Sequence, residues 1–250
     1  MGYRIGIDIG STAAKAAVLD QSLEIVYTLA MPTGYSGVNA AERLRVELVH
    51  AGYNPQGPDV RCVATGYGRI SVPYADKVVT EITCHGAGAT HLFGSDGVVV
   101  DIGGQDTKVI RLRGGKVAKF VMNDKCAAGT GRFLEVMADR LGLGQIELSD
   151  LARRGEPVKI SSMCTVFAES EVIGLVGRGE ARENIAAGII ESVVVRVAAL
   201  VRQVSGSPYI LTGGLCENPY VVERLSAHLG AAVETSPKAR FAGAIGAALQ

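Results

Sequence analysis

The chain has 250 residues, with 25 Lys or Arg against 25 Asp or Glu, so its formal net charge is zero. This balance argues against a general binder of nucleic acid or acidic lipid, which would need a basic patch. Hydrophobic residues make up 48 % of the chain, enough for a sizeable core in one large domain or two similar lobes. No apolar run approaches the roughly 20 residues needed to span a bilayer, and the N-terminal residues lack the layout of a signal peptide. We therefore expect a soluble, cytoplasmic protein.

Glycine and cysteine also stand out in the composition. The chain contains 32 Gly among its 250 residues, well above the roughly 7 % of average proteins. It also contains five Cys, and an odd number in a reducing compartment is a poor basis for a disulfide framework. The thiols are therefore inert core residues or metal ligands, and composition alone leaves both alternatives open.

The first part of the chain reads as strands joined by short turns, with two helices. Apolar and β-branched runs predict strands over residues 4–9, 14–19, 23–29 and 60–65. A helix is predicted over 38–52, because apolar residues recur on one face and Gly52 suits its C-terminus. A second helix is predicted over 81–93, although Gly86 and Gly88 lower the helix propensity there.

The pattern then begins again. Apolar runs predict strands over residues 97–102, 107–113, 116–122, 209–212 and 232–235. Gly114 and Gly115 form a hairpin turn between the second and third of these strands. Helical periodicity predicts helices over residues 130–141, 149–154, 168–176, 183–204, 220–229 and 239–249. The helix over 183–204 is long and has an apolar side that includes Ile189 and Val193.

A short motif repeats between the two parts of the chain. It has an aspartate, an isoleucine and a glycine, with a lysine seven residues after the aspartate. Its copies are Asp8-Ile9-Gly10 with Lys15 and Asp101-Ile102-Gly103 with Lys108. Each copy ends an apolar strand and enters a glycine turn that leads to another strand. The repeat predicts two lobes of related topology, over residues 1–95 and 96–250, with the C-terminal helix able to pack back onto the first lobe.

Both copies of the motif suit the phosphates of a nucleotide. Glycine lets the backbone approach closely, and the N–H groups of a tight turn form an anion cradle. Ser11, Thr12 and Lys15 add donors in the first copy. Asp8 and Asp101 can hold Mg²⁺ through water. For either copy alone, the alternative is an ordinary hairpin with a buried aspartate.

A third glycine turn, at residues 211–215, favours the nucleotide interpretation. The turns belong to neither of the two common nucleotide-binding motifs. The chain lacks Gly-x-x-x-x-Gly-Lys, and its turns lead to strands instead of helices, which excludes a Walker loop and a Rossmann fingerprint.

At these motifs the chain resembles the superfamily of actin, heat-shock ATPases and sugar kinases. The matching segments are the two phosphate motifs at 8–15 and 101–108, the adenosine motif at 211–215 and the second connecting helix at 242–247. The resemblance implies an α/β, two-lobed, duplicated actin-like ATPase (ribonuclease H-like) fold, with ATP and Mg²⁺ in the inter-lobe cleft. It gives Asp8 and Asp101 catalytic roles. Gln105 and Asp106 become candidates to position the water that attacks the γ-phosphate. The nucleotide-binding residues that it implies are Gly10, Ser11, Thr12, Lys15, Gly103, Gly104, Thr107, Gly213 and Gly214.

Two cysteines lie just ahead of predicted helices. Cys126 precedes the helix over 130–141, and Cys164 precedes the helix over 168–176. A helix N-terminus favours negative charge and lowers the pKa of a thiol, so both positions suit thiolates that ligate a metal cluster. Two thiolates cannot complete a four-cysteine cluster, but a twofold dimer would present the pair twice around its axis. The alternative is that both are core residues.

Segments 123–133 and 161–170 closely resemble the ATP-dependent activators of 2-hydroxyacyl-CoA dehydratases and the related ATPase subunits of benzoyl-CoA reductases. The resemblance covers essentially the whole chain, including segments 81–85 and 100–106. It implies that Cys126 and Cys164 hold one 4Fe-4S cluster across a homodimer. By the same resemblance, a ferredoxin or flavodoxin supplies the electron. A dehydratase-like partner with its own iron–sulphur clusters receives it, under anaerobic conditions.

The remaining candidates have structural interpretations. Cys62 and Cys84 are expected in core or structural positions, whereas Cys216 borders the adenosine turn and would approach the nucleotide without binding metal. Glu169 and Glu171 follow Cys164 closely, and we expect them to complement the first helical turn instead of ligating iron.

Two other functions use the same predicted ATP site. A small-molecule kinase is the main alternative, although a chain of 250 residues leaves little room for an acceptor-binding insertion. The third possibility is a binding module that uses ATP only as a conformational switch.

Overall fold

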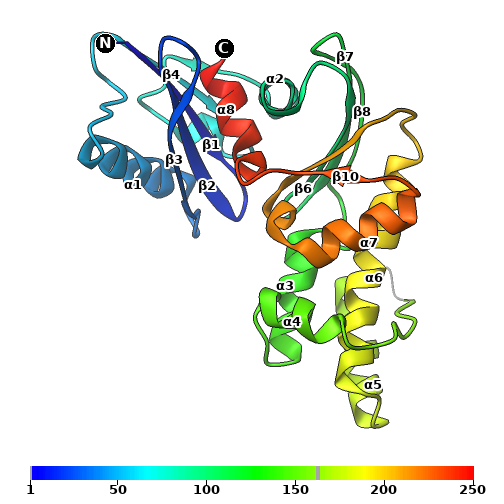
Figure 1. The fold of residues 1–250 in the computed structure, drawn as a ribbon. Helices are drawn as coiled ribbons and strands as arrows, with labels where there is room; N and C mark the ends of the chain where they lie inside the picture. Colours follow the sequence, from blue (N-terminus) through cyan, green and yellow to red (C-terminus); the bar gives the residue numbers. More distant parts are fainter. Residues whose placement is uncertain (1, 162–163) are drawn as a thin grey trace. The chain divides into compact units, whose positions relative to one another are not determined.

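The computed structural model describes residues 2–161 and 164–250 (Figure 1). Residues 162 and 163, which belong to the second cysteine motif, lie outside the described residues. Within the described chain, two five-stranded sheets are present. The first has the order β3-β2-β1-β4-β5. Its strands are β1 (Tyr3–Ile9), β2 (Ala13–Leu19), β3 (Ile25–Pro32), β4 (Val60–Thr65) and β5 (Lys77–Val78). β1 pairs antiparallel with β2 and parallel with β4, which places Asp8 opposite both Lys15 and Thr65.

The second sheet repeats this strand order. Its order, β10-β9-β6-β7-β8, is that of the first sheet when it is read from the opposite edge. Its strands are β6 (Gly97–Ile102), β7 (Thr107–Arg113), β8 (Lys116–Asn123), β9 (Tyr209–Gly213) and β10 (Val233–Glu234). The two repeated motifs therefore end equivalent strands, β1 and β6. This confirms the duplicated α/β topology that the sequence predicts.

The described chain divides into two compact units, each made of discontinuous segments. The first contains residues up to Val99, Ile110–Lys119 and Pro237–Gln250, and the second contains Val100–Val109 and Phe120–Ser236. The C-terminal segment thus belongs to the first unit. As domain limits, 1–95 and 96–250 stay predictions.

In the first unit, helices cover both faces of the sheet. Buried side chains of α1 (Gly37–His50), including Leu44 and Leu48, pack in a cluster with Ile5 and Ile7 of β1. On the opposite side of β1, α8 (Ala242–Ala248) approaches so closely that a Cβ on Gly6 would collide with the carbonyl oxygen of Ala244. Figure 1 shows α8 beside β1 and β2.

Glycines of α2 (Glu81–Phe93) have a packing role. A Cβ on Gly88 would collide with the carbonyl oxygen of Ala242, and one on Gly246 would collide with the carbonyl oxygen of Cys84. The helix forms over the predicted residues despite its glycines, because these allow α2 and α8 to pack backbone against backbone. The low intrinsic propensity of glycine is thus offset by tertiary packing.

The second unit carries helices grouped around α6. They are α3 (Gly131–Arg140), α4 (Gln145–Ala152), α5 (Thr165–Gly177), α6 (Arg182–Val201) and α7 (Pro219–Leu229). Helices α3, α4, α5 and α7 all contact α6 (Figure 1). By length and composition α6 could cross a membrane, but most of it is buried inside the protein. Its buried residues, such as Ile185 and Val193, identify it as a core helix.

Several element boundaries differ from the predictions, and the starts of three helices have clear structural descriptions. α4 begins four residues before the predicted 149, because the Glu147 carboxylate accepts a hydrogen bond from the Gly144 backbone N–H and caps the helix there. α5 begins at Thr165 instead of 168, so Cys164 is its N-cap residue. The predicted helix 239–249 begins as a short 3₁₀ segment, Ala239–Phe241, before α8.

Candidate nucleotide site and metal-ligating cysteines

In the first unit, the glycine turn after β1 surrounds a buried aspartate. Asp8 is 6 % exposed at the end of the strand, and the Gly10 N–H closes the turn onto the Ala13 carbonyl oxygen at 3.1 Å. Gly66, with φ +91°, lies so close that a Cβ there would collide with Asp8 Oδ1. A Cβ on Gly243 of α8 would lie 2.7 Å from Asp8 Oδ2. The carboxylate is thus enclosed by glycine backbone.

The other predicted residues of this turn are accessible. Ser11 and Thr12 are exposed, and Lys15 is partly exposed on β2. Their hydroxyls and ammonium are therefore placed where they can meet a ligand from solvent, beside backbone N–H groups of a tight turn.

The second unit repeats this geometry with different residues. The Gly103 N–H closes the turn after β6 onto the Asp106 carbonyl oxygen at 2.9 Å. Gly213, with φ +79°, occupies the place of Gly66, because a Cβ there would collide with Asp101 Oδ1 and the Ile102 carbonyl oxygen. Gly214 has open space around its Cα. The structure therefore brings Asp101, Gly103 and Gly213 together.

The equivalence of Gly66 and Gly213 was missed by sequence reasoning, which did not include Gly66 among the site residues. The signal was present, because Thr65-Gly66 and Thr212-Gly213 each follow an apolar strand. The order of the two sheets makes β4 the counterpart of β9.

Lys108 is a second residue that the sequence-based site lacked. Its side chain is 2 % exposed, and its Nζ lies 2.7 Å from Asp106 Oδ1 and 3.5 Å from Asp101 Oδ2. One buried ammonium therefore holds together two carboxylates that the sequence predicted to be catalytic. Gln105 is exposed at the tip of the same turn, between Gly104 and Asp106.

Thr107 faces the interior of the unit. Its side chain is 2 % exposed, and its Oγ1 donates a hydrogen bond of 2.7 Å to the Gly129 carbonyl oxygen. The hydroxyl that was expected to contact nucleotide is therefore bonded to the loop that carries Cys126.

Cys126 is exposed on a loop that polar contacts hold in shape. The Asn123 side-chain amide donates to the carbonyl oxygens of Cys126 at 2.9 Å and Ala128 at 3.2 Å. Thr130 Oγ1 donates to the Ala127 carbonyl oxygen at 2.6 Å and supports the turn that leads into α3. The loop presents the thiol ahead of the helix, as the sequence predicts.

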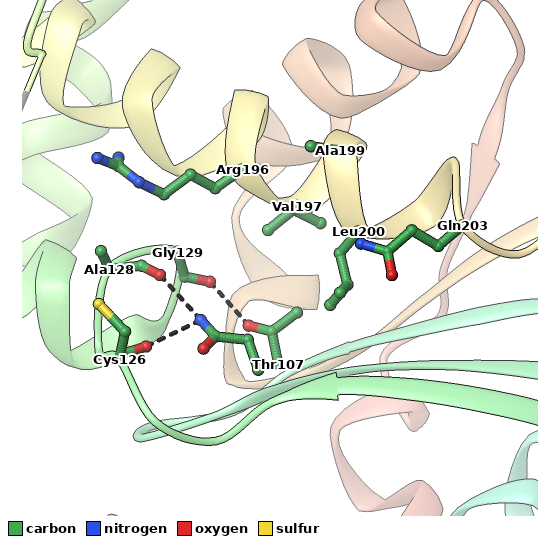
Figure 2. A pocket seen from close by; sticks show the side chains of 10 residues that line it. Thr107, Cys126, Ala128, Gly129, Arg196, Val197, Ala199, Leu200 and Gln203 are labelled. Atoms are coloured by element: carbon green, nitrogen blue, oxygen red, sulfur yellow. Dashed lines mark hydrogen bonds between the residues drawn. The ribbon is translucent and has the colours of Figure 1, made fainter. Parts of the chain in front are cut away.

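Cys126 also lines a pocket of about 270 Å³ together with Arg196 of α6 (Figure 2). Burial lowers the pKa of the Arg196 guanidinium, and the negative charge of the Cys126 thiolate acts in the opposite direction. Arg196 Nη1 donates to the Ser192 carbonyl oxygen at 2.8 Å. Sequence reasoning did not find Arg196, because it lies 70 residues from Cys126 in a helix that otherwise reads as core.

Cys164 is exposed at the N-cap of α5. The two acidic residues that follow it contact neighbouring segments. Glu171 accepts hydrogen bonds of 3.1 Å and 3.0 Å from the backbone N–H and Oγ of Ser161. Glu169 Oε1 lies 2.6 Å from Nε of Arg140 on α3. The ion pair links the two helices that follow the two cysteines.

The five cysteines fall into two groups. Cys126 and Cys164 are exposed, so the core alternative is wrong for both. Cys62, Cys84 and Cys216 are buried, and burial was predicted for Cys62 and Cys84. Burial raises the pKa of Cys62 to about 12 and that of Cys84 to about 11, which keeps these thiols protonated. Among the described residues, no group of three or more His, Cys, Asp or Glu is gathered around a possible metal position.

Comparisons with known proteins show what the whole chain is similar to. The (R)-2-hydroxyglutaryl-CoA dehydratase activating ATPase of Acidaminococcus fermentans is 43 % identical, over 99 % of this chain and 96 % of its own. The activator of lactoyl-CoA dehydratase of Anaerotignum propionicum is 42 % identical over the same shares of the two chains. The structure of the Clostridium difficile activator of 2-hydroxyisocaproyl-CoA dehydratase, with bound ADPNP, matches with a TM-score of 0.89 and 38 % identity, covering 99 % of this chain and 93 % of that chain.

Kinases with a similar fold are more distant in sequence. A glucokinase of the ROK family from Streptomyces griseus has a TM-score of 0.61 and 15 % identity, which supports the actin-like fold and no more. The kinase alternative is therefore not favoured. The model of the BadF/BadG/BcrA/BcrD ATPase family matches residues 5–250. The chain is a member of the BadF/BadG/BcrA/BcrD ATPase family.

Proposed function

We propose that this protein is an ATP-hydrolysing 4Fe-4S electron-transfer protein that reductively activates a 2-hydroxyacyl-CoA dehydratase or a related reductase. The observation that carries the proposal is the exposure of Cys126 and Cys164 ahead of α3 and α5, in the unit that also holds the second phosphate turn. Relatives that share 42–43 % of its residues are named as dehydratase activators. A soluble protein of the cytoplasm fits this role.

The nucleotide part of the proposal assigns roles to both glycine turns. The N–H groups that follow Asp8 and Asp101 bind phosphate, and the two carboxylates hold Mg²⁺ through water. Asp106 and Gln105 orient the attacking water, because both belong to the turn at the end of β6. Gly213 and Gly214 receive the adenosine, and Gly214 leaves open space for it. The support from a relative is the ADPNP bound to the Clostridium difficile activator.

Two exposed thiols suit an iron–sulphur cluster that is shared between two chains. Thiolates are the ligands of such clusters, and four are required. In a twofold dimer Cys126 and Cys164 of each copy would complete the set. The cluster would supply a low-potential electron. Hydrophobic side chains of α5 near Cys164 are exposed and suit a surface covered by a second copy: Val166, Phe167, Ile173 and Val176.

Energy coupling explains why such a protein would hydrolyse ATP. Moving one electron uphill by about 300 mV takes roughly 7 kcal/mol, which nucleotide turnover can supply. A ferredoxin or flavodoxin would donate the electron, and the dehydratase would accept it. An exposed cluster reacts with oxygen, so we expect function under anaerobic conditions.

Purification without oxygen tests the proposal. We expect a coloured dimer that contains iron and sulphide, and the loss of both in Cys126→Ala and in Cys164→Ala. Cys216→Ala serves as the matched control, because this cysteine is buried in the same unit. A colourless wild-type protein that takes up no iron on reconstitution would refute the cluster. Phosphoryl transfer to a sugar or carboxylate, with both exposed cysteines dispensable, would instead establish the kinase alternative.

A further inference from the structure

Three hydrogen bonds join the second phosphate motif to the loop of Cys126 and to the start of α3, which follows that loop. The backbone N–H groups of Gly131 and Arg132, at the start of α3, donate to the carbonyl oxygens of Gly103 and Gly104, both at 2.9 Å. The third bond runs from Thr107 Oγ1 to the Gly129 carbonyl oxygen at 2.7 Å. The backbone that would bind phosphate is thus bonded directly to the first residues of α3, and Thr107 is bonded to the loop that presents the thiol.

These contacts are close, and the one between Thr107 and Gly129 is shielded from water because both residues are buried. A Cβ on Gly131 would lie 3.3 Å from the Gly103 carbonyl oxygen. Gly129 has φ +92°, a conformation in which its carbonyl faces Thr107. Figure 2 shows this bond as a dashed line from Gly129 to Thr107, to the right of Cys126 and Ala128. Because Thr107 is 2 % exposed, water cannot easily replace its hydroxyl, and loss of the hydroxyl would leave a buried carbonyl oxygen without this donor.

The first repeat provides an internal comparison. Thr107 lies six residues after Asp101, and the residue six after Asp8 is Ala14, which is also buried. The turn itself closes in the same way in both repeats, at 3.1 Å after β1 and 2.9 Å after β6. The hydroxyl is therefore not needed to form a phosphate turn. It occurs in the repeat that carries the cysteine loop.

The neighbours of Thr107 connect it to the charged part of the site. Asp106 precedes it in the turn, and Lys108 follows it and contacts both Asp106 and Asp101. Bound Mg²⁺ would compete with Lys108 for these carboxylates, and bound phosphate would compete with the carboxylates for the Lys108 ammonium, because all are charged groups in a poorly hydrated site. A shift of the ion pair would move the start of β7 and with it the Thr107 hydroxyl.

We propose that Thr107 is a positioning residue that couples the nucleotide state of the second phosphate turn to the position of the Cys126 thiol. This inference rests on the proposed function and replaces the expected nucleotide contact of Thr107. The hydroxyl acts on the Gly129 carbonyl, and through it on the loop from Cys126 to Thr130. Loss of this coupling would reduce the effect of nucleotide on the cluster. It would leave the nucleotide affinity of the cluster-free protein unchanged.

The variants Thr107→Val and Thr107→Ser separate a coupling role from a binding role. Valine has the same shape and no donor, whereas serine keeps the hydroxyl. We expect the reduction potential of the wild-type cluster, measured by EPR-monitored titration, to shift when ADP is replaced by a non-hydrolysable ATP analogue. In Thr107→Val this shift should fall by about half or more, and in Thr107→Ser it should return. Affinity for ADP in the cluster-free protein, measured by calorimetry, should be retained in both.

Each outcome has a distinct meaning. A wild-type protein without a cluster, or with a potential that ignores nucleotide, contradicts the proposed function. A Thr107→Val protein with the full wild-type shift overturns the inference alone. Loss of most ADP affinity in cluster-free Thr107→Val makes Thr107 a nucleotide ligand and also overturns it.

Hydrogen–deuterium exchange of the wild-type, cluster-free protein keeps the inference testable if Thr107→Val fails to fold. We expect the amides of residues 127–132 to become more protected when the ATP analogue binds, because the turn and the loop share hydrogen bonds. Unchanged exchange in this segment, with nucleotide bound and the glycine turn at 103–104 protected, would overturn the inference.

Discussion

Replacing Lys108 by methionine should destabilise the second unit, because Lys108 is a buried cation between two carboxylates. Methionine fills a similar volume but leaves the carboxylates of Asp101 and Asp106 without the ammonium now 3.5 Å and 2.7 Å away. Breaking a buried ion pair by removing one partner costs about 3–5 kcal/mol. The Asp106 side chain is 24 % exposed and can regain water, so we expect the lower end of that range, about 3 kcal/mol. This loss corresponds to roughly a 100-fold change in the folding equilibrium.

Urea unfolding of the cluster-free protein, followed by circular dichroism, measures this loss. Lys15→Met is the matched control from the first repeat, because Lys15 is partly exposed and its removal should cost at most about 1 kcal/mol. Adding Asp101→Asn to Lys108→Met should recover about 1 kcal/mol or more, since a buried charge is removed. If Lys108→Met were as stable as Lys15→Met, or if the double variant were no more stable than the single one, the argument from buried charge would be refuted.

Three further outcomes are expected. Gly213→Ala should weaken nucleotide binding at least about tenfold in calorimetry, because φ +79° and the Asp101 carboxylate leave no place for a Cβ. Gly214→Ala should fold like the wild type, because its Cβ would meet open space. Equal effects of the two substitutions would contradict the geometry. Asp101→Asn should slow phosphate release from ATP by about 100-fold, and an unchanged rate would exclude this carboxylate from catalysis. The pKa values of Cys62 and Cys84 are raised to about 12 and about 11 in the folded protein. The unfolded chain therefore loses these two protons at a lower pH than the folded protein does. Urea unfolding should therefore show full stability below about pH 9 and a decline as the pH rises to about 11, and a pH-independent free energy of unfolding over that range would contradict it.

Strand positions were largely predictable because continuous apolar, β-branched runs have few other stable arrangements. The repeated aspartate–glycine motif also indicated the duplicated sheet. Helix boundaries were harder where a tertiary contact decides them. The Glu147 carboxylate caps α4 at Gly144, so the helix begins earlier than predicted. The glycines of α2 have low helix propensity, and only the structure shows that they allow close packing against α8.

The sequence predicted the type of chemistry at the candidate site, but it did not predict which side chains contact one another there. An aspartate followed by glycine indicates a phosphate turn, and that signal does not reveal that Lys108 bridges Asp101 and Asp106. The resemblance to actin-like ATPases placed Thr107 among the expected nucleotide-binding residues, and its hydroxyl here donates to a backbone carbonyl. Its partner, the Gly129 carbonyl, lies 22 residues away in the chain. Sequence spacing gives no account of such pairings, which depend on how the loop after β8 returns to the turn after β6.

ATP-dependent electron transfer tests the central claim most directly. The reduced, cluster-loaded protein is mixed without oxygen with a 2-hydroxyacyl-CoA dehydratase, and reduction of the acceptor is followed by EPR with ATP, with ADP and with a non-hydrolysable ATP analogue. We predict transfer of one electron that requires ATP and that Cys126→Ala and Cys164→Ala both abolish. Transfer at the same rate without ATP, or ATP turnover that leaves the acceptor oxidised while the cluster stays reduced, would contradict the account.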